Sequence, residues 1–170
     1  MIKQLMPDAC IGADVIVGFP GETSADFEDT YEFIASLDVS YLHVFTYSER
    51  PGTKASLMSE AIDVHERRER NERLRILSEK KLRAFYQTQI GKTLDVVLEG
   101  RSVNCTNDDT AVSEGYSDNY VRVKLSNEVA NEVTSVRATL SSIEQDHMTG
   151  EMIDILTTRA SRTLELPILA

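Results

Sequence analysis

Hydrophobic and polar positions follow two different rhythms along this 170-residue chain, and the change falls near Gly91. Before it, short apolar runs alternate with segments whose apolar residues are three or four positions apart, which is typical of alternating strands and helices. After it, apolar and polar residues alternate with a period of two, as they do in half-buried strands. The pattern predicts an α/β part over residues 1–90, an all-β part over residues 91–154, and a tail over residues 155–170.

The first part contains one strand–helix–strand unit. Residues 13–17 form an apolar run with a single Asp, which predicts a strand covered on both faces. Residues 24–37 have helical spacing, and residues 39–47 are rich in β-branched and aromatic side chains, so a second, parallel strand is expected there. A long charged helix over residues 63–89, within a linking segment 63–90, follows; Gly91 ends it.

The second part is predicted to be a small β-barrel. Strands are expected over residues 93–98, 133–140 and 148–156, and residues 114–125 are expected to form a turn that leads into a strand. Short strands separated by Gly, Asn and Asp are typical of small barrels.

The turn after the first strand is the strongest candidate for a ligand site. Ligands in α/β proteins bind beyond the carboxyl ends of the strands, and glycine lets the backbone approach a ligand closely. A purely structural turn is the alternative. The residues of this turn that would face a ligand are Gly18, Phe19, Gly21, Glu22 and Thr23.

Charge and cysteine content exclude several classes of protein. The formal net charge of −10, from 18 Lys and Arg against 28 Asp and Glu, argues against a broad electrostatic binder of nucleic acid but leaves room for a local basic face. No apolar run is long enough to cross a membrane, and the N-terminus lacks the layout of a signal peptide. Cys10 and Cys105 are the only cysteines, which favours a reducing, cytoplasmic location. Two thiols cannot hold a four-iron cluster.

Two segments can bind RNA. In the β-part, aromatic, amide and basic groups lie close together, as in barrels that stack bases and hold phosphates; an ordinary tyrosine-containing strand is the alternative. The residues are Tyr116, Asn119, Tyr120, Arg122 and Lys124. On the long helix, eight basic and five acidic residues lie between positions 63 and 86. They form either a solvated face or a basic ridge that includes Arg67 and Arg70.

Two motifs resemble a known family. Residues 12–23 read GADVIVGFPGET, and residues 42–55 read LHVFTYSERPGTKA. In this order they resemble the later part of the radical S-adenosylmethionine domain of methylthiotransferases. The segment GYSDNYVRV at residues 115–123 resembles the TRAM domain, an RNA-binding β-barrel that closes these enzymes. The resemblance covers residues 1–153.

The resemblance implies a specific architecture and activity. It implies the last two βα units of a radical-SAM (β/α) barrel, then a small OB-like TRAM barrel. The complete enzyme uses S-adenosylmethionine and two [4Fe-4S] clusters and modifies tRNA. The wording of the motifs is most similar to the branch that acts on threonylcarbamoyladenosine next to the anticodon; the other branches act on isopentenyladenosine or on an aspartate of a ribosomal protein. Gly18 to Thr23 would form a wall of the S-adenosylmethionine site, with His43, Phe45 and Tyr47 pointing into the barrel.

The family's cluster-binding CxxxCxxC motif is absent from this sequence, so we expect the isolated chain to be inactive. Open strand edges of an incomplete barrel predict self-association through residues 13–47. A stand-alone RNA-binding or interaction module without enzymatic activity is the alternative interpretation.

Overall fold

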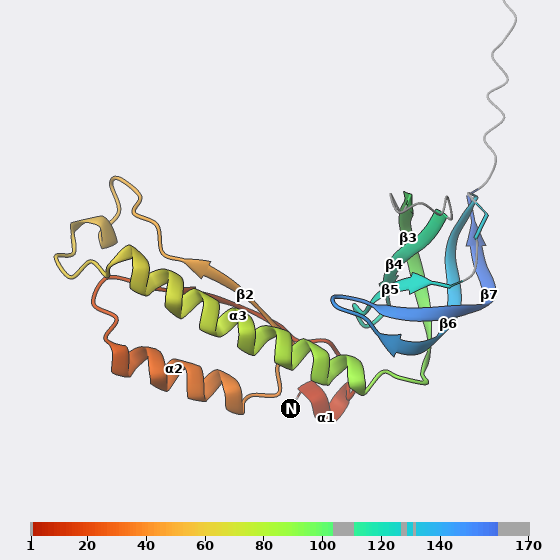
Figure 1. The fold of residues 1–170 in the computed structure, drawn as a ribbon, viewed down its shortest axis with the longest axis horizontal. Helices are drawn as coiled ribbons and strands as arrows, with labels where there is room; N and C mark the ends of the chain where they lie inside the picture. Colours follow the sequence, from red (N-terminus) through yellow and green to blue (C-terminus); the bar gives the residue numbers. More distant parts are fainter. Residues whose placement is uncertain (1, 104–110, 127–128, 131, 160–170) are drawn as a thin grey trace, which may run out of the picture. The chain divides into compact units, whose positions relative to one another are not determined.

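The computed structural model describes residues 2–103, 111–126, 129–130 and 132–159, and it divides the chain into two compact units, residues 1–88 and 89–170. Cys105 therefore lies outside the described residues. Figure 1 shows the order of the elements along the chain.

The first unit is a two-stranded parallel sheet with two helices. Strand β1 (Gly12–Val17) pairs with β2 (Tyr41–Thr46), so that Asp14 lies opposite His43 and Ile16 opposite Phe45. Along the chain, α2 (Ser24–Ser36) connects the two strands, and α3 (Val64–Gln87) follows β2 (Figure 1). A short helix α1 (Ile2–Leu5), which the sequence pattern did not predict, precedes β1, and a 3-10 turn η1 (Ala55–Leu57) lies in the loop after β2. The parallel strand–helix–strand unit is confirmed.

Both long helices pack on the same face of the sheet. The buried cluster joins Val17 and Leu42 of the strands to residues of the two helices. Those helix residues are Phe27, Ile34, Leu74 and Leu77. The expectation that β1 is covered on both faces is wrong for the described structure, because helices cover only one face and Ile16 on the other face is 60% exposed.

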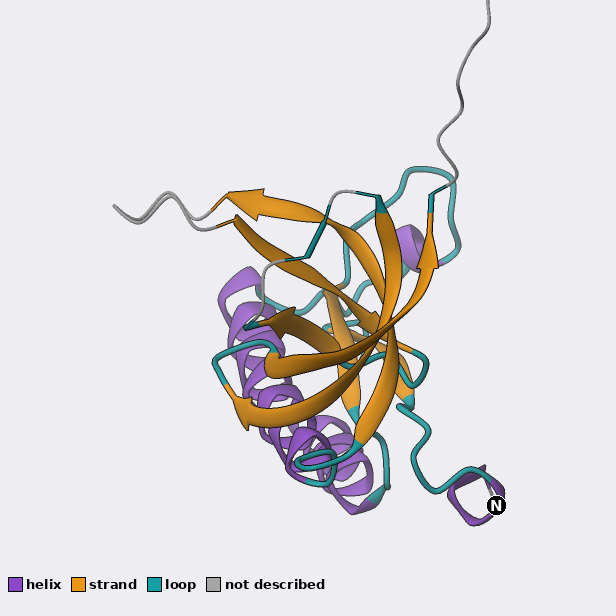
Figure 2. Ribbon diagram, turned by 90° about the vertical axis from the view of Figure 1, so that its right-hand side faces the viewer, coloured by secondary structure: helices purple, strands orange, loops and turns teal. Residues whose placement is uncertain are grey.

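The second unit is a closed five-stranded barrel, which confirms the predicted all-β part. Its strands are β3 (Thr93–Val103), β4 (Ala111–Ser117), β5 (Arg122–Leu125), β6 (Val133–Ile143) and β7 (Met148–Thr158). They close in the order β3-β4-β5-β7-β6, with β5 and β7 parallel and the other pairs antiparallel. Figure 2 shows these strands, in orange, curving round one another. Strand β7 continues four residues into the segment expected to be a tail.

The barrel interior is filled by aliphatic side chains. Alternation along β5 buries Val123 and Leu125 and leaves Arg122 and Lys124 partly exposed. Val96, Val136, Leu140 and Met148 from the other strands are also fully buried. The outward positions of β4 and β5 are thereby fixed by the packing of their neighbours.

Candidate functional site

Hydrogen bonds within the protein hold the glycine turn after β1 in place. Gly18 and Gly21 have φ angles of +76° and +87°, which a glycine adopts without steric penalty. The backbone N–H of Gly18 donates to Glu22 Oε2 (2.7 Å), and the N–H of Gly21 donates to the Glu60 carbonyl (2.9 Å). Phe19 closes the turn by accepting from the N–H of Glu22 (3.0 Å). Of the predicted ligand groups in this turn, the N–H of Gly18, the N–H of Gly21 and the carboxylate of Glu22 bind within the protein.

Thr23 begins α2 rather than facing a ligand. Its hydroxyl accepts from the N–H of Asp26 (3.1 Å), and Asp26 accepts from the N–H of Thr23 (2.9 Å). This reciprocal capping box satisfies backbone donors at the start of the helix. The hydrogen bonds from Thr23 lower the pKa of Asp26.

Arg67 and Arg70 do not form part of an exposed basic ridge. They are 5% and 4% exposed. Arg70 forms ion pairs with Glu22 and Glu66 and donates to the Glu22 carbonyl (3.0 Å). The alternating charges of α3 predict solvated side chains, but these two lie on the side of the helix that packs on the glycine turn and the loop after β2. Both guanidinium groups are engaged there, so they are not available to RNA in this structure.

The uncovered face of the sheet carries the other predicted cofactor residues. His43 and Phe45 are exposed on β2, and the ring of His43 packs edge-on against Tyr41, 5.1 Å between centroids. Asp14 and Ile16 of β1 lie opposite them in register. Tyr41, His43 and Phe45 therefore share one open face, as their spacing predicts.

A cavity of about 380 Å³ lies at the carboxyl ends of β1 and β2. Ile16 and Phe45 supply apolar walls, and Tyr47, packed edge-on against Phe19 (5.3 Å), continues them. The Tyr47 hydroxyl is buried and has no hydrogen-bond partner in the part of the chain that the structure describes. The remaining lining residues come from the strand end and the following loop: Thr46, Ser48, Arg50, Thr53 and Ala55. Sequence reasoning did not include Arg50 among the site residues, although it lies in the loop that follows the second strand.

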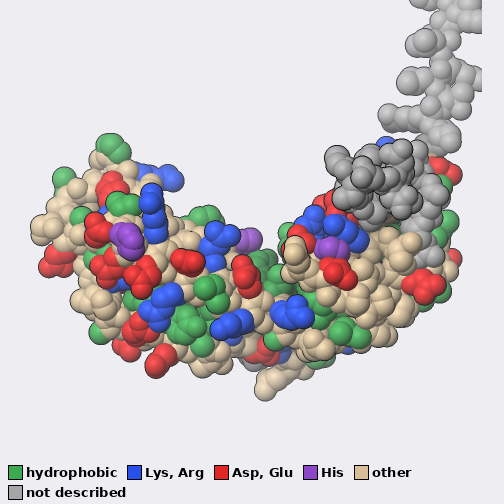
Figure 3. Space-filling view, in the orientation of Figure 1, with side chains coloured by type: hydrophobic (Ala, Val, Ile, Leu, Met, Phe, Trp, Pro, Cys, Tyr) green, Lys and Arg blue, Asp and Glu red, His purple; other side chains and the backbone are tan. Residues whose placement is uncertain are grey.

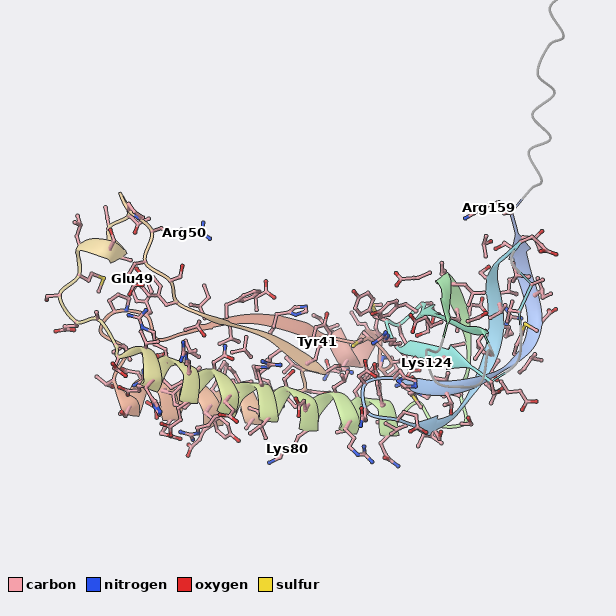
Figure 4. The ribbon with its side chains drawn as sticks, turned by 45° about the horizontal axis from the view of Figure 1, so that its top comes forward. Tyr41, Glu49, Arg50, Lys80, Lys124 and Arg159 are labelled. Atoms are coloured by element: carbon pink, nitrogen blue, oxygen red, sulfur yellow. The ribbon has the colours of Figure 1, made fainter. Side chains whose placement is uncertain are left out.

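The barrel brings the predicted RNA-binding residues of β4 and β5 together. Tyr116 lies opposite Arg122 in the ladder, and Glu114 opposite Lys124. The rings of Tyr116 and Tyr120 are stacked, with centroids 4.9 Å apart and planes 26° apart. Val97, which is 61% exposed, lies opposite Tyr116 on the neighbouring strand. We call Val97, Tyr116, Tyr120, Arg122 and Lys124 the β4–β5 face; Figure 4 labels Lys124 on it.

Tyr120 has an unusual backbone conformation. It is the only described non-glycine residue with a positive φ angle, +66°. The N–H of Tyr120 donates to the Ser117 carbonyl (2.9 Å), and the N–H of Ser117 donates to the Val121 carbonyl (2.9 Å). Three-residue hairpin loops of this kind favour glycine at the left-handed position. A 59% exposed tyrosine there is more strained than glycine would be, and such strain is concentrated at functional sites.

Asn119 has a structural role in the same loop. Its amide group donates to Gln89 Oε1 (3.0 Å), and its carbonyl accepts from the Ser117 hydroxyl (2.7 Å). Both ends of this side chain bind within the second unit. Of the five predicted RNA-binding residues of this unit, Asn119 is therefore the one that shapes the loop.

Acidic residues balance the charge of the β4–β5 face. Arg122 forms ion pairs with Glu114 and with Asp146, which lies in the turn between β6 and β7. The pKa of Asp146 is lowered mainly by the hydrogen bond from His147, and to a smaller extent by the positive charge of the nearby Arg122. Sequence reasoning missed Asp146 and His147 because only the barrel's closure brings this turn next to β5. Figure 3 shows Lys, Arg, Asp and Glu interspersed over the visible surface of both units.

The described residues contain no helix of the length and apolarity that a membrane crossing requires. Within the same residues, no three His, Cys, Asp or Glu side chains are grouped so as to hold a metal ion.

Comparison with known proteins shows what the chain is similar to. No family model matches it. The threonylcarbamoyladenosine tRNA methylthiotransferase MtaB of Aquifex aeolicus is 41% identical over 118 residues, 69% of this chain and 29% of that protein. MtaB of Bacillus subtilis is 37% identical over 122 residues, 72% of this chain and 27% of that protein. The tRNA-2-methylthio-N(6)-dimethylallyladenosine synthase of Symbiobacterium thermophilum is 39% identical over 99 residues, 58% of this chain and 21% of that protein.

These comparisons confirm the resemblance to methylthiotransferases. The matched stretches span less than a third of each relative. The relatives' names include two different modified nucleosides, so similarity alone does not distinguish the substrate branch.

Proposed function

We propose, from the premise that this chain is homologous to a stretch of the tRNA methylthiotransferases, that it is the C-terminal part of such an enzyme. The complete protein would add a 2-methylthio group to N6-threonylcarbamoyladenosine next to the anticodon. This part would supply tRNA binding through residues 91–154 and a wall of the S-adenosylmethionine site through residues 1–90. The similarity to MtaB and to dimethylallyladenosine synthases supports the general reaction.

The chain alone does not fit the family's iron–sulfur clusters. A cluster needs three or four protein thiolates, and the sequence has two cysteines. We therefore assign no step of the reaction to these residues. Cluster ligands would belong to the remainder of a complete enzyme, and the chain alone is expected to be inactive.

The open face of the sheet fits the role of a cofactor wall better than the glycine turn does. His43 and Phe45 are exposed and next to the cavity end of the sheet, and Tyr47 lines the cavity. The glycine turn holds the end of β1 and the start of α2 in place, and it thereby fixes the position of the strands that form this wall. Gly18, Phe19, Gly21, Glu22 and Thr23 would thus act on S-adenosylmethionine through the strands that they position.

The β4–β5 face is the observation that carries the proposal of RNA binding. OB-type barrels bind oligonucleotides on the face of their second and third strands and with the loop between the fourth and fifth. Strands β4 and β5 are second and third in this barrel, and the turn with Asp146 joins the fourth and fifth. The stacked Tyr116 and Tyr120 offer a platform for bases, and Lys124 offers a charge for phosphates. Arg122 would have to exchange Glu114 or Asp146 for a phosphate, which its partly exposed position permits.

Tyr120→Gly tests this role with opposite effects on fold and binding. Glycine removes the strain at φ +66°, so the urea midpoint of the chain should stay level or rise. Loss of the ring should weaken binding of an unmodified tRNA anticodon stem-loop at low salt, by about 1–3 kcal/mol for a stacked base. Fluorescence anisotropy in a salt titration measures the affinity.

The matched control is Ile153→Ala, because Ile153 is 60% exposed on β7. It should leave RNA affinity unchanged. If the wild-type chain fails to bind RNA at low salt, where phosphate contacts are strongest, the RNA-binding part of the proposal is wrong.

A stand-alone RNA-binding module is the second candidate function, and the closed barrel with its stacked Tyr116 and Tyr120 favours it, because that face needs no iron–sulfur cluster. The two candidates differ in what happens to cellular tRNA. Deleting the complete gene should remove the 2-methylthio group from one tRNA nucleoside, as measured by mass spectrometry of digested tRNA. The nucleoside that loses the group identifies the substrate branch, whereas unchanged tRNA would support the module.

A further inference from the structure

A single buried cation fixes the loop that follows β2. Arg67 Nη1 donates to the Tyr47 carbonyl (3.1 Å), and Nη2 pairs with Glu49 (2.7 Å). Its Nε donates to the Ile62 carbonyl (2.8 Å). One guanidinium group on α3 therefore holds both ends of residues 48–62, which we call the β2–α3 loop.

Within the β2–α3 loop, a tight turn fixes the backbone of Arg50. The N–H and the hydroxyl of Thr53 both donate to the Arg50 carbonyl, at 3.3 and 2.9 Å. Pro51 and Gly52, whose φ is +83°, occupy the central positions that a type II turn requires. Arg50 thus begins a turn whose ends and centre are both specified.

The side chain of Arg50 faces away from these contacts. Glu49 turns toward Arg67, and Arg50 is exposed and lines the cavity beyond the strand ends. Figure 4 shows it extending outward from the loop. In the part of the chain that the structure describes, no carboxylate pairs with Arg50. Arg67, Arg70, Arg73, Arg122 and Arg137 have such partners. The exposed Arg68, Arg75 and Arg83 of α3 also lack one among the described residues, but unlike Arg50 they do not line this cavity.

We propose that Arg50 binds a backbone phosphate of the RNA substrate at the rim of this cavity. An unpaired guanidinium group on a fixed turn is pre-organised for two parallel hydrogen bonds to a phosphate. Ile16 and Phe45 line the same cavity and carry no charge that would pair with Arg50 in place of a phosphate. This inference rests on the proposed function, because it takes RNA as the ligand; it adds a contact in the first unit, apart from the β4–β5 face.

Arg50→Ala in the full chain tests the contact, with Lys54→Ala as the matched control. Lys54 is an exposed cation in the same loop but does not line the cavity. For an anticodon stem-loop RNA at low salt, Arg50→Ala should weaken binding about two- to fivefold, as for one exposed charge pair. It should lower the slope of log affinity against log salt by about one. Lys54→Ala should change neither, and Arg50→Lys should restore part of the affinity but not the bidentate contact.

Ultraviolet crosslinking adds a positional measurement. Crosslinked wild-type chain, digested and analysed by mass spectrometry, should yield RNA-linked peptides that contain Phe45 or Tyr47, and Arg50→Ala should reduce their yield. Equal losses for Arg50→Ala and Lys54→Ala would show diffuse attraction only and overturn the inference.

The same binding measurements distinguish an error in the Arg50 contact from an error in the proposed function. Suppose that the wild type binds RNA and that Tyr120→Gly weakens binding whereas Arg50→Ala does not. In that case the Arg50 contact is wrong, and the proposal of RNA binding stands. If the wild type does not bind RNA, both fail together.

Discussion

Gly18 meets two separate requirements at the end of β1. Its φ is +76°, and a Cβ atom placed there would lie 2.4 Å from Cγ of Arg67. Gly52 shares the first requirement, with φ +83°, but has open space around its Cα. Comparing the same substitution at Gly18 and at Gly52 therefore distinguishes the effect of backbone strain from that of steric overlap.

Gly18→Ala should therefore destabilise the first unit more than Gly52→Ala does. Gly52→Ala should lower the free energy of unfolding by about 1–2 kcal/mol through the left-handed backbone alone. Gly18→Ala should lower it by about 1–3 kcal/mol more, because Arg67 must move. Urea unfolding followed by circular dichroism measures both, and equal losses would show that Arg67 gives way without penalty.

At the same scale, the role of a charged residue was the hardest to predict from sequence. Arg67 and Arg70 continue the helical spacing of the buried Leu74 and Leu77, whereas Arg68 and Arg75 lie off that face and are exposed. The spacing marks the face but does not identify the partners that allow an arginine to be buried there. The burial of Arg67 and Arg70 depends on Glu22 and Glu49, which come from distant turns. By contrast, Tyr116, Tyr120 and Arg122 could be grouped from sequence because one hairpin carries them all.

At the scale of the element, the β2–α3 loop depends on the charge of Glu49. The hydrogen bond from Arg67 lowers the pKa of Glu49. A carboxylate with a lowered pKa in the folded state stabilises the fold above its unfolded pKa, about 4.3, and this contribution is lost as the pH falls through the folded pKa. We therefore expect the loop to loosen on acidification below about pH 4.

Limited proteolysis with pepsin across pH 2–5 measures this loosening. Cleavage within residues 48–62 should rise as the pH falls in the wild type. In Glu49→Gln, which keeps the shape but not the charge, cleavage should be high at pH 5 already and depend less on pH. Asp95→Asn is a matched control, because Asp95 pairs with Arg137 in the barrel and its pKa is also lowered; it should leave cleavage of the loop unchanged.

Most element boundaries could be predicted because local signals define them. The helix expected over residues 24–37 is α2, Ser24–Ser36, which Thr23 and Asp26 cap. Strands β3, β6 and β7 are longer than expected, since pairing across the barrel extends strands beyond their apolar residues. Register across non-local pairs has no sequence signal, so the approach of Asp146 to Arg122 could not be predicted.

At the scale of the whole molecule, the two edges of the β1–β2 sheet differ. At the outer edge of β2, side chains of α3 form hydrogen bonds with the strand backbone. The Ser78 hydroxyl accepts from the Leu42 N–H (2.8 Å) and donates to the Leu42 carbonyl (3.2 Å). Asn71 donates to the Val44 carbonyl (3.2 Å). On β1, the carbonyls of Ile11 and Val17 accept from the β2 side. Since backbone groups alternate along a strand, those of Gly12, Asp14 and Ile16 face the other edge.

That free edge of β1 is where the sheet can be extended. In a complete relative of three to five times the matched length, further strands of the polypeptide would pair there. In the isolated chain, the same groups and the exposed Ile16 and Phe45 offer a surface for a second copy, because unpaired edges template association.

The isolated chain should consequently dimerise through β1, and Asp14→Pro should prevent it. Proline removes the N–H of Asp14, which faces the free edge, and leaves the bonds between β1 and β2 intact. Sedimentation velocity over a hundredfold concentration range should show a monomer–dimer equilibrium for the wild type and a monomer for Asp14→Pro. Ser24→Pro, at the first turn of α2 where proline is tolerated, is the control for a general effect of proline and should still dimerise. A wild type that stays monomeric throughout the range would show that the open edge is tolerated in water.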